Sequence, residues 1–275
     1  MMEGEKASMK CQSLVVLIRG AGEMATGVAH RLNESRLRVC LLEVAKPLAV
    51  RRTICFSEAV YDGEKEVEGV WAKLIATQDE IHSVWEEEKI PVLIDPDSRQ
   101  TCDFLKPDVV VDAILAKRNL GTRSDDAPLV IGLGPGFIAG KDVQVVIETN
   151  RGHHLGRVIL QGEAEPDTGI PGEIGGYSVE RVLRTMKKGI FGSTKSIGDP
   201  VSKGTVVAVV DDFPVIAQIS GMIRGLLRDG VEVRRGTKVG DIDPRGKKEY
   251  CFTISEKARA IGGGVLEAIL HQFNQ

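Results

Sequence analysis

Aromatic residues make up only 4% of the sequence, and basic residues are not in excess. The 36 lysines and arginines stand against 39 aspartates and glutamates, for a formal net charge of −3. Proteins that bind nucleic acids present a basic surface, and those that bind single strands add aromatic side chains on which bases stack. A nucleic acid partner is therefore not expected.

Long apolar runs are absent as well. No stretch approaches the ~18 apolar residues of a membrane-spanning helix. Arg19 and Gly20 interrupt the first apolar run, which leaves no core for a secretion signal. With 42% hydrophobic residues for ordinary cores, the sequence predicts a soluble, cytoplasmic protein without membrane contact.

Cysteine patterns typical of metal or disulfide sites are also missing. The five cysteines form no C-x-x-C pair and do not alternate with histidine, so neither a metal site nor a disulfide framework is predicted. Cys40 lies inside an apolar run and is expected to be a small buried residue. Reactivity stays open at Cys55 and Cys102, which have polar neighbours. The other two are Cys11 and Cys251.

The sequence does contain a glycine turn between an apolar run and a segment of helical composition. Residues Leu14 to Arg31 read LVVLIRGAGEMATGVAHR, which includes the pattern G-x-G-x-x-A. Gly20 would permit a tight turn, and Gly22 would let a phosphate approach the backbone, in a conformation that a β-branched residue would reject. Strand, glycine turn and helix in this order are typical of a dinucleotide-binding unit.

Glu43 supplies the second half of this pattern. It ends the apolar run from Val39 to Leu42, at about the 20-residue spacing of the acidic residue that binds a ribose 2′-hydroxyl. A carboxylate there disfavours a 2′-phosphate, so the sequence favours NAD over NADP. Arg51 and Arg52 would reverse this preference by folding back, unless they are ordinary surface charges.

Glu23 opposes a bound nucleotide, because its carboxylate in the first helical turn would repel a pyrophosphate. Arg19 and the Thr26 hydroxyl would offset that repulsion. The predicted cofactor site takes NAD or another nucleotide; alternatively, the glycines only let the chain turn. Its residues are Gly20, Gly22, Thr26 and Glu43.

Two further apolar runs end in aspartates, where α/β sheets place ligands. Asp95 precedes Pro96 and is expected to cap the next helix instead. His153 and His154 would point to opposite faces of a strand, so they predict no metal site, although His154 could act as an acid or base. The candidate catalytic residues are Asp112, Lys117, Asn119 and His154.

The fold class predicted is α/β, with a Rossmann-like, mainly parallel sheet and a second, β-rich domain. The motif V-x-x-G-T occurs at Val201 to Thr205 and at Val233 to Thr237, and this region resembles a biotinyl/lipoyl-type barrel-sandwich hybrid. The hairpin Asp211 to Phe213 lacks the lysine of such carriers. The expected divisions are a nucleotide-binding domain (1–150), a glycine-rich loop and connecting segment (151–195), the barrel-sandwich domain (196–250) and a C-terminal helix (251–275).

Five phrases in one order carry a more specific resemblance: IRGAGEMATGVAHRL, VDAILAKRNLGT, VIGLGPGFIAG, VIETNRGHHLGRVI and VGDIDPRG. Together they resemble the YqeB-type accessory proteins of selenium-dependent molybdenum hydroxylases, over roughly Leu14 to Gln275. The resemblance implies a maturation factor whose partner is a molybdenum hydroxylase or its maturation machinery, and it supplies no catalytic residues.

Two alternatives stay open: an NAD-dependent oxidoreductase acting on a small molecule, and a non-catalytic scaffold that docks a partner. An oxidoreductase would need a base near the nicotinamide, for which Asp112, Lys117 or His154 would serve. Whether the chain is an enzyme, and whether it forms a homo-oligomer, are not determined by these patterns.

Overall fold

The computed structural model describes residues 14–274, so Cys11 lies outside the described residues. The chain divides into two compact units. Within the described residues, unit 1 comprises 14–47, 56–167 and 254–274, and unit 2 comprises 48–55 and 168–253. Each unit therefore combines stretches that are distant in the sequence, whereas each division expected from the sequence is one contiguous range.

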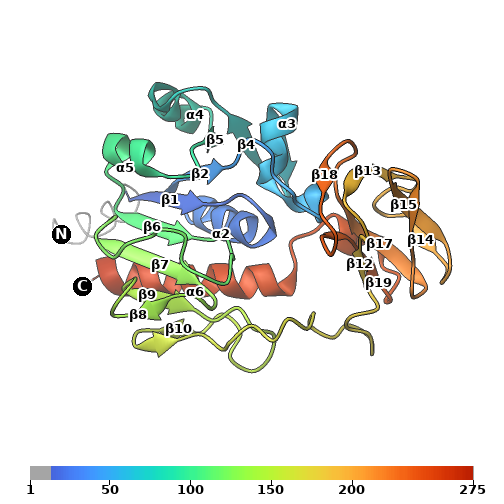
Figure 1. Ribbon diagram of the computed structural model, residues 1–275. Helices are drawn as coiled ribbons and strands as arrows, with labels where there is room; N and C mark the ends of the chain where they lie inside the picture. The colour runs from blue at the N-terminus through green and yellow to red at the C-terminus, as the bar shows by residue number, and fades with distance from the viewer. Residues whose placement is uncertain (1–13, 275) are drawn as a thin grey trace. The chain divides into compact units, whose positions relative to one another are not determined.

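Unit 1 is built on a nine-stranded sheet with the order β10-β9-β7-β6-β1-β2-β5-β4-β3 (Figure 1). A separate pair, β8 (Ile138–Ala139) and β11 (Gly162–Glu163), is antiparallel. The strands of the large sheet are β1 (Val15–Arg19), β2 (Arg38–Glu43), β3 (Glu64–Val67), β4 (Val70–Leu74), β5 (Ile90–Ile94), β6 (Val109–Asp112), β7 (Leu129–Leu133), β9 (Val145–Ile147) and β10 (Val158–Ile159).

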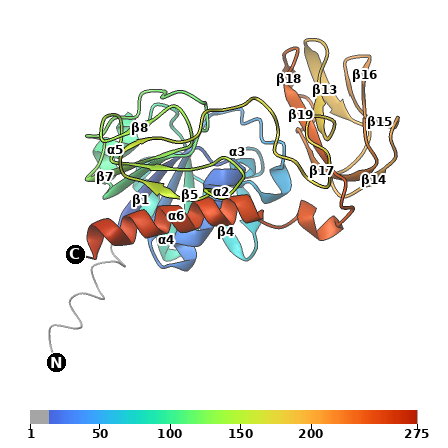
Figure 2. The same ribbon diagram turned by 90° about the horizontal axis from the view of Figure 1, so that it is seen from below.

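Helices cover both faces of this sheet. On one face, α2 (Glu23–Glu34) packs on β1 and β2, and α6 (Glu256–Phe273) packs on β7, β9 and β10 (Figures 1 and 2). On the other face, α4 (Ile81–Glu86) and α5 (Arg99–Leu105) share a hydrophobic core with Leu17 and Cys40 of the sheet. The short helices are α3 (Ala59–Asp62), η1 (Arg52–Ile54), η2 (Phe56–Glu58), η3 (Gln78–Glu80) and η4 (Lys248–Cys251).

No helix within residues 14–274 has the length and apolar character needed to span a membrane. The expected C-terminal helix is confirmed as α6, where the Ser255 hydroxyl accepts a hydrogen bond from Ala258 N and caps the first turn.

The prediction of a Rossmann-like fold is wrong, although the inner strands of the sheet do run parallel. The sheet is mixed, because β3 and β10 at its two edges run antiparallel to β4 and β9. A doubly wound fold places a helix in each crossover. Here no helix connects β6 to β7 or β7 to β9, and α6 from the end of the chain covers that part of the sheet. The strand, glycine turn and helix predicted for Leu14 to Arg31 are nevertheless present as β1 and α2.

Glycines let α6 approach its neighbours closely. A Cβ added at Gly262 would lie 2.9 Å from the Gly27 carbonyl oxygen of α2, and one added at Gly264 would meet the Gly156 carbonyl oxygen. A Cβ at Gly263 would meet nothing within 4 Å. Two of the three consecutive glycines of α6 are therefore explained by packing.

Unit 2 contains two four-stranded antiparallel sheets, β12-β19-β17-β14 and β16-β15-β13-β18. Their inner faces share one hydrophobic core that includes Phe191, Ile223 and Ile242. The strands are β12 (Val182–Arg184), β13 (Gly189–Ser193), β14 (Pro200–Val201), β15 (Val206–Val210), β16 (Phe213–Ile216), β17 (Gly221–Leu226), β18 (Glu232–Val233) and β19 (Lys238–Asp243).

The prediction of a barrel-sandwich hybrid is wrong, since these strands form two separate sheets. The repeated V-x-x-G-T motif does mark equivalent turns, one between β14 and β15 and one between β18 and β19. Such a motif fixes where the chain turns, but the pairing of strands depends on contacts between distant residues.

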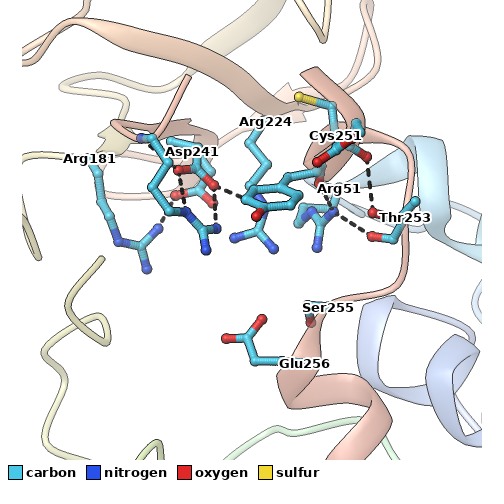
Figure 3. A network of polar contacts seen from close by, with 12 residues as sticks. Arg51, Arg181, Arg224, Asp241, Cys251, Thr253, Ser255 and Glu256 are labelled. Atoms are coloured by element: carbon cyan, nitrogen blue, oxygen red, sulfur yellow. Dashed lines mark hydrogen bonds and ion pairs between the residues drawn. The ribbon is translucent and has the colours of Figure 1, made fainter. Parts of the chain in front are cut away.

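A buried polar network joins the segments of unit 2 (Figure 3). Arg51 Nη2 donates to the carbonyl oxygens of Tyr250, at 2.7 Å, and Thr253, at 3.1 Å, and thereby ties residues 48–55 to the end of the unit. Arg181 pairs with Asp241, and both are buried. Arg51 is only 4% exposed, so the interpretation of this residue as a surface charge is wrong.

Asp243 is the second buried carboxylate of this network. Arg245 Nη2 lies 2.6 Å from its Oδ2, and Arg224 Nε lies 3.8 Å from the same atom. Burial alone would raise the pKa of Asp243, but the hydrogen bonds from Arg245 and the two nearby guanidinium charges hold it below its usual value. Carboxylates thus balance part of the arginine charge inside unit 2.

Candidate functional site

The glycine turn lies at the end of β1, next to the end of β2, as expected for the candidate nucleotide site. Gly20 has a φ of +96°, and its amide donates to the Leu42 carbonyl oxygen at 2.7 Å. A Cβ at this position would lie 3.2 Å from the Ala113 carbonyl oxygen. Both the backbone conformation and the close neighbour therefore require glycine here.

Gly22 precedes the first turn of α2 and faces open space. Its φ of −70° and ψ of −169° are accessible to any residue. The expectation that its backbone conformation rejects a β-branched residue is therefore wrong. A Cβ added to Gly22 would meet nothing within 4 Å, so room exists directly in front of the amides of the helix start.

Glu43 contacts the glycine turn through its side chain. Its Oε2 accepts a hydrogen bond from Ala21 N at 2.9 Å, and its Oε1 accepts one from Val44 N at 2.8 Å. Burial raises the pKa of the Glu43 carboxyl, against the opposing effect of these two hydrogen bonds. Each oxygen retains a second lone pair with which it can accept a ligand hydroxyl.

Thr26 lies beneath the turn and is fully buried. Its hydroxyl donates to the Ala21 carbonyl oxygen at 3.2 Å and accepts from Phe56 N at 2.9 Å, so it fixes the chain after the turn. The structure thus brings Gly20, Gly22 and Glu43 together at one edge of the sheet and places the Thr26 hydroxyl in the core.

Asp112 is also buried, at the end of β6 beside β1. Its Oδ2 lies 3.4 Å from Arg19 Nη1 and accepts a hydrogen bond from the Thr122 hydroxyl at 2.6 Å. Its Oδ1 accepts from Ile114 N at 3.1 Å. Arg19 is therefore held inside this cluster. Contrary to the expectation from the sequence, it does not offset the charge of Glu23.

The other candidate catalytic residues have separate surroundings. Asn119 Oδ1 accepts from the amides of Gly121 and Thr122, both at 2.8 Å, and so shapes the loop after β6. The exposed Lys117 lies 3.4 Å from Asp167, and the exposed His154 stacks edge-on with His153. Within residues 14–274, no direct hydrogen bond or ion pair joins these side chains to Asp112.

Asp95 supports the start of α5, as expected for a capping residue. Its Oδ2 accepts from the Thr101 amide at 3.1 Å and from the Thr101 hydroxyl at 2.7 Å.

Lys257 is a half-buried residue of unit 1 that the sequence patterns did not single out. It lies in the first turn of α6, which begins beside α2 because the Ser255 hydroxyl donates to Glu23 Oε1 at 2.9 Å. Burial lowers the pKa of Lys257, with further lowering by Arg151 and Lys117. A cation in the first turn of a helix opposes the helix dipole, and this is the signal that could have identified it.

The described cysteines are buried, except Cys102, which is half-buried. Cys40 and Cys55 are buried, which confirms the expectation for Cys40. Burial raises the pKa of the Cys102 thiol to about 11, so it is protonated near neutral pH and the reactive interpretation of Cys102 is not supported. No group of three or more His, Cys, Asp or Glu residues within 14–274 is arranged to hold a metal ion.

Solved structures resemble the chain only distantly. The apo ectoine utilization protein EutE (DoeB) of Ruegeria pomeroyi is 13% identical, with a TM-score of 0.25 over 84% of this chain and 86% of that one. An aspartoacylase family protein of Mesorhizobium loti is 13% identical, with a TM-score of 0.27 over 84% and 85%. TcdA (CsdL) is 12% identical, with a TM-score of 0.35 over 100% and 93%. These scores are too low to establish a shared fold.

Sequence similarity is far stronger to one curated protein, while no protein-family model matches the chain. The chain is 51% identical over 261 residues to "Uncharacterized protein YqeB" of Escherichia coli strain K12. The aligned region covers 95% of this chain and 48% of YqeB, so the chain spans about half the length of that relative. Over nearly all its length, the chain is therefore similar to YqeB, which supports the YqeB-type resemblance of its five motifs.

Proposed function

We propose that unit 1 binds a nucleotide, NAD in the first instance, at the glycine turn between β1 and α2. The hydrogen bond from Ala21 N to Glu43 Oε2 is the main support for this proposal, because it joins the glycine turn to the acidic residue within one site. In this arrangement the phosphates lie before Gly22, where an added Cβ meets nothing within 4 Å, and Glu43 accepts the ribose hydroxyls.

We further propose that the chain acts in the cytoplasm as an accessory or maturation factor for a selenium-dependent molybdenum hydroxylase. This role rests on the YqeB-type resemblance of the five motifs. The 51% identity with YqeB supports the resemblance to YqeB and does not itself indicate a role. The nucleotide then serves a maturation step, and the partner is the hydroxylase or its maturation machinery.

Calorimetry with NAD tests the nucleotide site. The wild type binds NAD, and Gly22→Val abolishes binding because its side chain fills the space of the pyrophosphate while its backbone conformation stays allowed. Glu43→Ala weakens binding about ten- to a hundredfold, as expected for a lost charged hydrogen bond of about 1.5–3 kcal/mol. Gly263→Ala, on the open side of α6, is the matched control and binds normally. Absence of NAD, NADP and ATP binding by the wild type would overturn the nucleotide site.

Complementation tests the accessory role. In cells that lack this chain, the hydroxylase is recovered without activity, and the wild-type gene restores it. Gly22→Val folds, as judged by its thermal transition, but does not restore activity. Full restoration by Gly22→Val would contradict a role for the nucleotide. Turnover of a small alcohol or acid with NAD by the purified wild type would instead establish the oxidoreductase alternative.

A further inference from the structure

A pocket of about 370 Å³ lies in unit 1 where β2 begins. Residues from the C-terminal ends of α2 and α4, and the residues that follow both helices, form its wall. Glu43, which contacts the glycine turn, is at the other end of β2. The pocket is therefore separate from the proposed nucleotide site. Its charged lining residues are Arg36, Arg38, Glu86, Glu88 and Lys89.

Trp85, which also lines the pocket, has a fixed position. Its Nε1 donates to the Val39 carbonyl oxygen at 2.7 Å, and its ring packs against the core that α4 and α5 share with the sheet. His82 contacts the ring edge-on, with the two ring centroids 5.3 Å apart. The Arg38 guanidinium lies over the ring, 5.6 Å from its centroid. This contact holds the guanidinium in place without using its N–H donors, which keep the fork geometry that matches a carboxylate or a phosphate.

Neither Arg36 nor Arg38 has a side-chain partner among the described residues that would use these donors. Their guanidinium groups form no hydrogen bond or ion pair between residues 14 and 274, although two glutamates line the same pocket. Lys89, by contrast, lies 2.6 Å from Glu64 and 3.5 Å from Glu87. Two guanidinium groups with unused donors thus line one small pocket, and such donors bind carboxylate and phosphate oxygens strongly.

Arg36 and Glu88 have a backbone conformation that favours glycine. Their φ angles are +66° and +56°, where any residue with a Cβ is strained. Each follows the C-cap of its helix, α2 or α4, a position at which glycine is the usual residue. Strained residues of this kind cluster at ligand sites. Here two charged side chains occupy strained positions, and both line the same pocket.

We propose that this pocket binds a small molecule bearing a carboxylate or phosphate group, and that Arg36 and Arg38 bind the anionic group. Trp85 is a positioning residue that holds Arg38. Glu86 and Glu88 disfavour a ligand whose negative charges extend across the pocket, so the site suits a single anionic group. The inference goes beyond the proposed nucleotide site and does not depend on it.

Tryptophan fluorescence tests this binding at the pocket itself. The chain has two tryptophans, and Trp71 is 44% exposed, so Trp71→Phe leaves Trp85 as the reporter in an intact fold. Titration of this variant with inorganic phosphate and with acetate, at an ionic strength held constant with chloride, gives a saturable change for at least one probe. The two probes distinguish a phosphate site from a carboxylate site. Absence of a saturable change with both probes would overturn the proposal, whether or not NAD binds at the glycine turn.

Substitution of Arg38 in the same background tests its role. Arg38→Met weakens binding of the effective probe about tenfold or more, as expected for a lost charged hydrogen bond. Arg123→Met is the matched control, because Arg123 is an exposed arginine of unit 1 that pairs with Asp125 and does not line this pocket. Its loss leaves the affinity unchanged. Equal affinities of Arg38→Met and Arg123→Met would contradict the proposal.

Arg36→Gly separates binding from folding. Glycine relieves the strained backbone at this position, so the midpoint of urea unfolding rises while the affinity falls about tenfold. Glu88→Gly relieves the same kind of strain but removes a negative charge, so its midpoint also rises and its affinity is at least that of the wild type. A similar loss of affinity in both variants would show that the loops, and not the arginine charge, determine binding, and would overturn the proposal.

Discussion

Asp112 illustrates how a carboxylate at the end of a buried strand can serve the fold. Its partners Arg19 and Thr122 come from β1 and from the loop after β6, and all three side chains are buried. Removing one partner of a buried ion pair leaves an uncompensated charge. The cluster therefore fixes β6 and its following loop against β1.

We expect Asp112→Asn to destabilise unit 1 by about 3–5 kcal/mol, because the Arg19 guanidinium would stay buried without its counter-charge. Both tryptophans, Trp71 and Trp85, belong to unit 1, so urea unfolding followed by tryptophan fluorescence reports on this unit. Asp125→Asn, which breaks an exposed pair with Arg123, is the control and leaves the transition near that of the wild type. An equal effect of both variants would contradict the structural role of Asp112.

The raised pKa of Glu43 predicts a pH dependence of nucleotide binding. Since burial raises this pKa above 4.5, the carboxyl begins to take up a proton at a higher pH than an exposed glutamate does. The protonated form accepts ribose hydroxyls less well, so NAD affinity falls as the pH is lowered towards and through the Glu43 pKa. Calorimetry at a series of pH values from about 8 down to about 5, which approaches the usual carboxylate pKa, measures the loss of NAD affinity. Glu43→Gln removes this dependence, and an unchanged pH profile in that variant would argue against Glu43.

At the scale of elements, α6 combines low intrinsic helix propensity with close packing. Its three consecutive glycines lower the helix propensity in the middle of the helix. Gly262 and Gly264 allow the backbone of α6 to approach Gly27 and Gly156, whereas Gly263 has no close neighbour. The position of α6 over the sheet depends on this close approach.

We therefore expect opposite effects from two adjacent substitutions. Gly263→Ala stabilises unit 1 by about 0.5–1 kcal/mol, because alanine favours the helix and its Cβ meets nothing within 4 Å. Gly262→Ala destabilises it, because the new Cβ would lie 2.9 Å from the Gly27 carbonyl oxygen. Urea unfolding monitored by tryptophan fluorescence distinguishes them. Stabilisation by both substitutions would show that α6 does not need the close contact with α2.

At the scale of the whole molecule, each unit has a hydrophobic core of its own. The core of unit 2 lies between its two antiparallel sheets and includes Phe191, which is 1% exposed. Segment 48–55 belongs to this unit although it lies far from 168–253 in the sequence. The chain therefore leaves unit 1 twice, and unit 2 is completed only when both stretches are in place.

Phe191→Ala should destabilise unit 2 by about 3–5 kcal/mol through the cavity it creates. Hydrogen exchange measured on peptides from residues 182–243 should become faster. Phe213→Ala, at a side chain that is 42% exposed, serves as the control and should leave exchange nearly unchanged. Unchanged protection of the strands in Phe191→Ala would contradict a single core shared by the two sheets.

The sequence by itself determined the local features of this protein. Strand β1, the glycine turn and α2 follow from short-range patterns, and so does the Ser255 cap of α6. Glu43 was also predictable at the end of β2, because the spacing along a strand, turn, helix and strand is nearly fixed. These features depend on residues that are close in sequence, whose propensities and hydrogen bonds act locally.

Only the tertiary structure decided the rest. The mixed strand order and the assembly of each unit from separated stretches depend on pairings between distant residues. The same is true of Asp112, whose partner Arg19 is 93 residues away, and of Ser255, which contacts Glu23 of α2 from near the end of the chain. Buried charges and close backbone contacts of this kind are determined by which surfaces meet, and local sequence patterns do not encode that choice.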